Sequence, residues 1–111
     1  MATRQLAHAA CEIDADAVVI AGDVAIADPR KVVECLQLFS DFEGAKLVVP
    51  GNHDLWTKRF DSWRIWNRLF PESAKLGGFH CLDRSPYLLG RCAFVGSVGW
   101  YDYSFADPAL G

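Results

Sequence analysis

Two short apolar runs, each followed at once by glycine and polar residues, constrain the fold of this sequence most. The first run is Ala17–Ala21, and Gly22 and Asp23 come directly after it. The second is Lys46–Val49, and the stretch Pro-Gly-Asn-His-Asp at 50–54 follows it. Continuous apolar, β-branched runs of this length are typical of strands that are buried on both faces of a parallel sheet.

The segment between the two runs has the pattern of a helix. Asp28 is a good N-cap, and Pro29 suits the first helical position. Apolar residues then recur at helical spacing as far as Phe39, and Gly44 is the expected stop. Strand, helix and strand give a βαβ unit over residues 17–49, with its two strands parallel. The predicted fold class is therefore α/β.

Further elements are expected on both sides of this unit. A helix is predicted over Thr3–Glu12, and another over Thr57–Phe70, where Pro71 is expected to end it. Three short strands are predicted after these helices, at Phe79–Leu82, Tyr87–Leu89 and Cys92–Val95. A chain of 111 residues allows one domain at most.

Composition narrows the function classes. The chain is 51% hydrophobic and 23% charged, which is typical of a globular domain. Its net charge of -3 argues against general nucleic-acid binding and against a membrane-surface protein. No apolar run reaches the length of a membrane span, and Met1–Ala10 has no signal-peptide core. The four cysteines lie among apolar neighbours without a Cys-x-x-Cys pair, which predicts free thiols and a cytoplasmic protein. The sequence leaves the oligomeric state open.

The polar residues after the two strands form a candidate catalytic site. Ligands of open α/β sheets bind beyond the carboxyl ends of the strands, so Asp23 is expected to meet Asn52, His53 and Asp54 there. Aspartate can bridge two cations, asparagine offers a neutral oxygen, and histidine handles protons near neutral pH. Two metal ions about 3.5–4 Å apart can support an in-line displacement at phosphorus. Gly22-Asp23 alone is typical of an ordinary turn, and the more specific Gly51–Asp54 can also be a turn. The pair, each directly behind an apolar strand, favours a functional site.

Gly22-Asp23 and Gly51-Asn52-His53-Asp54 resemble two motifs of the calcineurin-like metallophosphoesterases, over roughly residues 15–56. The resemblance implies a β-sandwich flanked by helices (α/β/β/α) and hydrolysis of a small-molecule or nucleotide phosphoester, by a phosphatase or a phosphodiesterase. It implies two divalent metal ions of the Mn, Fe or Zn class as cofactors. By resemblance, Asp23 bridges the two ions, Asn52 binds one of them, and His53 stabilises the transition state or protonates the leaving group.

The sequence also departs from the family pattern. It contains no Asp-x-His, which is the family's first metal motif, and no histidine follows His80, so the late metal histidines are missing. Ile26 stands where protein serine/threonine phosphatases have an aspartate that orients the catalytic histidine. That branch is disfavoured, and Asp54 and Asp28 remain alternatives for orienting His53, with Asp54 counted among the catalytic residues.

These departures predict that residues 1–111 are a single, incomplete metallophosphoesterase domain that holds the central part of the family pattern. An isolated incomplete domain is expected to be inactive. The alternatives to a hydrolase are therefore a catalytically silent fragment and a non-enzymatic binding or scaffold module that keeps the fold.

Three other stretches leave alternatives open. The segment Trp56–Phe70 combines aromatic residues with cations, which suits a phosphate or nucleobase site, but an amphipathic helix with its aromatic residues in the core is favoured. Trp100–Tyr103 lines a pocket or closes a strand, with equal support for each. His80 is interpreted as a strand residue rather than a metal ligand.

Overall fold

A parallel sheet of three strands, in the order β1-β2-β3, organises the computed structural model, which describes residues 2–99 and 107–110. Its strands are β1 (Ala17–Ala21), β2 (Ala45–Val49) and β3 (His80–Cys81). Ala17 pairs with Ala45 and Ala21 pairs with Val49, so β1 and β2 end level with each other. The predicted βαβ unit with parallel strands is confirmed.

Helix α2 (Pro29–Gln37) makes the crossover between β1 and β2. It begins as predicted, because the Asp28 carboxylate accepts a hydrogen bond of 3.0 Å from the backbone N–H of Arg30. It ends at Gln37, well before Gly44. The chain continues instead in tight turns, in which the backbone N–H of Phe42 donates to the carbonyl of Phe39.

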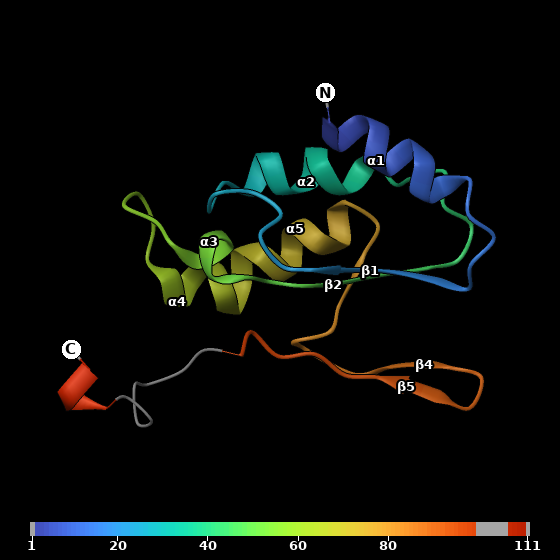
Figure 1. Cartoon of the computed structure of the whole chain (residues 1–111). Coiled ribbons are helices and arrows are strands. Elements are labelled where there is room, and N and C mark those ends of the chain that lie inside the picture. Colours follow the sequence, from blue (N-terminus) through green and yellow to red (C-terminus); the bar gives the residue numbers. More distant parts are fainter. Residues whose placement is uncertain (1, 100–106, 111) are drawn as a thin grey trace.

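The hydrophobic core lies between the sheet and the helices α2 and α5 (Phe70–Leu76), which pack against each other. Its most deeply buried members include Leu36, Val48, Phe70 and Ala74. Figure 1 shows α1 (Ala2–Cys11), α2 and α5 on one side of β1 and β2, with the hairpin of β4 and β5 on the other side. No helix in the described residues is both long and apolar enough to cross a membrane.

Two of the three predicted C-terminal strands are shorter in the structure. The stretch Phe79–Leu82 contributes only β3, because the N–H of Phe79 donates to the Ala74 carbonyl at the end of α5. Strand β4 (Tyr87–Leu89) has the predicted bounds and pairs antiparallel with β5 (Cys92–Phe94). The chain is thus a mixed α/β structure with a parallel sheet and a separate hairpin, and the full sandwich stays a prediction.

The prediction of one helix over Thr57–Phe70 is wrong. The structure has α3 (Asn52–Leu55), a non-helical segment over 56–61, α4 (Ser62–Arg64) and the π-helical η1 (Ile65–Leu69) before α5. The Thr57 hydroxyl accepts bonds from the backbone N–H groups of Arg59 and Phe60, each 3.0 Å long. These bonds replace helical ones and hold a turn.

Pro71 does not end a helix, contrary to the prediction. It lies in the first turn of α5, directly after η1. The backbone N–H of Phe70 donates to the Ile65 carbonyl, five residues back, so the helical path is widened where the proline enters. A π turn of this kind relieves the clash that a proline makes in a regular helix.

The cysteines are free thiols, as predicted. Burial raises the pKa of the Cys35 and Cys81 thiols, which keeps them protonated and unreactive at neutral pH. Cys81 is buried and Cys11 and Cys35 are half-buried, whereas Cys92 is exposed on the hairpin strand β5.

Candidate active site

The loops that follow β1 and β2 meet at the carboxyl edge of the sheet. Because the two strands end level, Gly22 and Asp23 lie beside Gly51, Asn52 and His53. The Asp23 carboxylate accepts a hydrogen bond of 3.1 Å from the backbone N–H of His53. The structure therefore brings together three of the four residues selected from the sequence, and one carboxylate connects both loops.

Two glycines allow this close approach. Gly22 and Asp23 both have positive φ, at 85° and 56°, so the chain turns sharply as it leaves β1. A Cβ on Gly22 would lie 2.7 Å from the Gly51 Cα, and a Cβ on Gly51 would lie 2.4 Å from Asp23 Oδ1. Backbone therefore packs directly on backbone here, and Asp23 takes a conformation that few residues with side chains adopt.

Gly51→Ala is expected to lower the free energy of unfolding by about 2–3 kcal/mol, because the methyl group must displace the backbone and carboxylate of Asp23. Urea unfolding followed by circular dichroism measures the change. Gly90→Ala is the control: a Cβ there meets nothing within 4 Å, although φ is +58°, so only backbone strain of about 1 kcal/mol is expected. A loss at Gly51 no larger than the loss at Gly90 contradicts the packing argument.

His53 and Asp23 form the polar centre of the edge. Nδ1 of His53 lies 3.2 Å from Oδ2 of Asp23, and both side chains are about half exposed, at 50% and 53%. The hydrogen bonds from the ring and then from the backbone N–H of His53 hold the pKa of the Asp23 carboxyl below its usual range. The carboxylate is thus ionised at neutral pH, and the stabilisation from this pair is lost as pH falls through the lowered pKa.

Asp54 has a different place from the one expected of a residue that orients His53. Its side chain is fully buried. Oδ1 accepts a bond of 2.8 Å from the backbone N–H of Ala25, and Oδ2 accepts one of 2.8 Å from the N–H of Gly51. Asp54 therefore fastens the loop after β1 to the turn after β2.

Neither Asp54 nor Asp28 shares a hydrogen bond or ion pair with His53 among the contacts of the described residues. Asp28 caps α2 instead. The carboxylate that contacts the His53 ring is Asp23, which the sequence reasoning had considered only as a metal ligand.

A cavity of about 680 Å³ opens beside Asp23 and Asn52. Its walls come from the ends of β1 and β2, from Trp56 and from the segment Ser97–Gly99. Asp23 and Asn52 thus offer two oxygen donors to one space, which suits part of a site for hard or borderline cations. Within residues 2–99 and 107–110 no group of three or more His, Cys, Asp or Glu side chains could hold an ion. Asp23 and Asn52 can therefore supply part of the donor set of a metal site but do not complete it.

A second cavity, of about 430 Å³, adjoins the first on the His53 side. Trp56 lines both cavities, and His53 lines the second. The expectation that the aromatic residues of the segment Trp56–Phe70 face the core is wrong for three of the five, because Trp56 is 67%, Trp63 62% and Phe60 36% exposed. Phe70, at 2% exposed, and Trp66, which packs partly buried against the core, follow the expectation. The non-helical turn over 56–61, which the sequence reasoning missed, directs the Trp56 ring outward.

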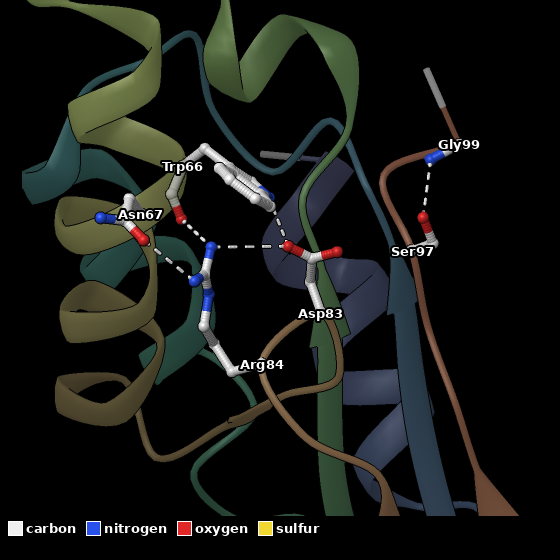
Figure 2. A network of polar contacts seen from close by, with 6 residues as sticks. All are labelled: Trp66, Asn67, Asp83, Arg84, Ser97 and Gly99. Atoms are coloured by element: carbon white, nitrogen blue, oxygen red, sulfur yellow. Dashed lines mark hydrogen bonds and ion pairs between the residues drawn. The ribbon is translucent and has the colours of Figure 1, made fainter. Parts of the chain in front are cut away.

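Another polar cluster joins η1 to the loop after β3 (Figure 2). Trp66 Nε1 donates to the Asp83 carboxylate, and the Arg84 guanidinium donates to the Trp66 carbonyl at 2.8 Å and to Asn67 Oδ1 at 3.2 Å. Arg84 also lies over the Trp66 ring, 4.5 Å from its centroid. The members satisfy one another, so this cluster fixes the π-helical segment in place.

His80 belongs to β3, as predicted, and its ring lies 2.8 Å from the Ser85 carbonyl and packs against Tyr87. Residues 100–103, for which a pocket wall and a strand end were both considered, lie outside the described residues.

Comparison with known proteins gives one match. A family model described as calcineurin-like phosphoesterase matches residues 2–105. No curated protein and no solved structure matches the chain.

Proposed function

Because this chain belongs to the calcineurin-like phosphoesterase family, whose members are metal-dependent phosphoesterases, we propose that it hydrolyses a small-molecule or nucleotide phosphoester at the edge formed by Asp23, Asn52 and His53. One observation carries the proposal. The ionised Asp23 carboxylate and the Asn52 side chain line one cavity, and the His53 imidazole, which contacts that carboxylate, lines the adjoining one, although Asn52 and His53 follow Asp23 by 29 and 30 positions in the sequence.

Asp23 and Asn52 are the residues that would hold metal. Two divalent ions of the Mn, Fe or Zn class, when bound, would supply positive charge to the phosphoryl oxygens. The carboxylate of Asp23 is ionised at neutral pH without the help of an ion, so no proton has to leave before binding. Asp23 and Asn52 supply only part of the donors that two full coordination shells require, so further ligands are needed.

His53 is the proposed proton donor or transition-state stabiliser. Its Nδ1 lies against the Asp23 carboxylate, and this contact fixes the orientation of the ring. The proton on Nδ1 is donated to the Asp23 carboxylate. Nε2 has no hydrogen-bond partner among the described residues, and the ring lines the second cavity. A leaving-group oxygen at Nε2 can therefore receive a proton from a protonated ring. Asp54 acts on this step only by positioning the loop that carries His53.

The proposal is tested by release of nitrophenolate from p-nitrophenyl phosphate and from bis(p-nitrophenyl) phosphate with Mn²⁺ present. Turnover that starts on addition of Mn²⁺ and stops on addition of EDTA is expected where further donors complete the metal site, whereas residues 1–111 as an isolated incomplete domain are expected to be inactive. The ratio of the two rates gives the preference for monoester or diester. Identical rates with Mn²⁺ and with EDTA would overturn the proposal of metal-dependent hydrolysis.

A catalytically silent binding module is the second candidate. The observation in its favour is the small donor set, since the described part of the chain groups no three acidic, histidine or cysteine side chains around an ion position. This candidate predicts that phosphoesters and Mn²⁺ bind without turnover. The hydrolysis assay and a calorimetric titration of the same sample separate the two.

The free thiols on all four cysteines support a reducing, cytoplasmic setting as part of the proposal.

A further inference from the structure

The second cavity, beside His53, has the chemistry of a binding site. Its volume of about 430 Å³ lies in the range of small-molecule pockets. Its walls are the segment 26–28 on one side and the segment 56–60 on the other. It touches the proposed reaction centre through His53 and the first cavity through Trp56. A molecule with its phosphoryl group near Asp23 therefore reaches this cavity by passing Trp56.

Aromatic rings in this cavity are open to solvent rather than packed in the core. Trp56 is 67% exposed and Phe60 is 36% exposed, which are large fractions for residues of this size. The Trp56 ring lies 5.8 Å from the His53 ring, centroid to centroid, so it stands next to the proposed proton donor. An exposed ring beside a reaction centre offers a face on which a planar group can stack.

Positive charge accompanies the rings. Lys58 and Arg59 line the cavity, and the Arg59 guanidinium lies 5.5 Å from the centroid of the Phe60 ring. The one carboxylate in the wall, Asp28, is engaged in capping α2. The Thr57 hydroxyl holds the turn through the N–H groups of Arg59 and Phe60, which fixes these cations at the rim. Rings with two cations suit an anion that carries a planar aromatic group.

We infer that this cavity binds the organic part of the phosphoester, and that this part is a planar aromatic group, either a nucleobase or a simple aryl ring. The inference rests on the proposed function for the position of the phosphoryl group. It goes beyond that function by naming Trp56 as the residue that sets substrate preference.

Binding without turnover tests the inference. Adenosine 5′-monophosphate, phenyl phosphate and ribose 5-phosphate are titrated into the full chain by calorimetry in EDTA, so that no hydrolysis takes place. Stacking of one base on an aromatic ring predicts that adenosine 5′-monophosphate binds about tenfold more tightly than ribose 5-phosphate, which lacks the ring. If phenyl phosphate binds as tightly as adenosine 5′-monophosphate, the site is assigned to aryl esters. If phenyl phosphate binds more weakly than the nucleotide, the site is assigned to nucleotides.

Variants of two tryptophans complete the test. Trp56→Ala is expected to abolish the tenfold preference, and Trp56→Phe is expected to keep most of it. Trp63→Ala is the matched control, because Trp63 is similarly exposed but packs on Trp66, 4.8 Å away, outside the cavity lining. Equal affinity for the nucleotide and the sugar phosphate in the unmodified chain would overturn the inference, as would equal losses for Trp56→Ala and Trp63→Ala. A Trp56-dependent preference without Mn²⁺-dependent hydrolysis would keep the pocket and reject the hydrolase.

Discussion

Asp54→Ala is expected to lower the free energy of unfolding by about 2–5 kcal/mol. The change removes the acceptor for two backbone N–H groups, those of Ala25 and Gly51, which the fully buried Asp54 carboxylate now satisfies. Each buried donor left without a partner costs about 1–3 kcal/mol. Small domains are stable by about 5–15 kcal/mol in total, so the variant is close to unfolding. Urea unfolding at pH 7, followed by circular dichroism, measures the loss.

Two further variants test whether the loss of stability comes from the two backbone hydrogen bonds that Asp54 accepts. Asp54→Asn keeps one carbonyl oxygen but turns an N–H group toward a backbone donor, so an intermediate loss is expected. Asp14→Ala removes an exposed carboxylate and is expected to change stability by less than about 0.5 kcal/mol. A loss under 1 kcal/mol for Asp54→Ala contradicts the assignment of Asp54 as the bond between the two loops.

His53→Ala and Asp23→Asn are each expected to lower Mn²⁺-dependent phosphoester turnover by roughly two to four orders of magnitude. The first variant removes the proposed proton donor. The second replaces an ionised carboxylate, which contacts the His53 ring at 3.2 Å, with a neutral amide that is a poorer cation ligand. Both side chains are half exposed, so the fold should survive either change. Turnover is measured at saturating p-nitrophenyl phosphate.

The matched control for these variants is Asp14→Asn, which makes the same chemical change at an exposed carboxylate outside both cavities. Its turnover is expected to equal that of the unmodified chain. Activity that survives Asp23→Asn and His53→Ala at more than a tenth of the original rate would place the reaction elsewhere.

The βαβ unit was predictable because local signals agreed with one another. Two apolar β-branched runs, the Asp28 cap and Pro29 all point to strand, helix and strand, and the tertiary structure keeps each of them. The meeting of Asp23 with Asn52 and His53 follows from that topology alone, because parallel strands place their carboxyl ends at one edge.

The segment after the site was not predictable from helical spacing. Residues 56–70 have apolar residues three and four apart, yet the Thr57 hydroxyl holds a non-helical turn and the helix begins only after the Asp61 N-cap. A π turn before Pro71 then lets the helix continue where a stop was expected. Side-chain bonds to the backbone decide these points, and periodicity does not register them.

The role of Asp54 was also out of reach of the sequence. In a Gly-Asn-His-Asp motif it is natural to place the last carboxylate beside the histidine. The structure instead turns residues 52–55 into one helical turn, which points Asp54 inward to two backbone N–H groups and leaves His53 to Asp23. Because of this helical turn, Asp54 positions the two loops, and Asp23 is the carboxylate that faces the cavity and contacts His53.

Paramagnetic line broadening by Mn²⁺ tests most directly whether Asp23 and Asn52 are metal ligands, and it detects even a weak, partial site. Backbone amide resonances of the full chain are recorded as Mn²⁺ is added at substoichiometric amounts. Broadening is expected first at residues 22–23 and 51–53, and it is expected to disappear from them in Asp23→Asn while persisting in Asp14→Asn. Broadening that begins elsewhere, or that is unchanged in Asp23→Asn, would contradict a metal-dependent site at this edge of the sheet.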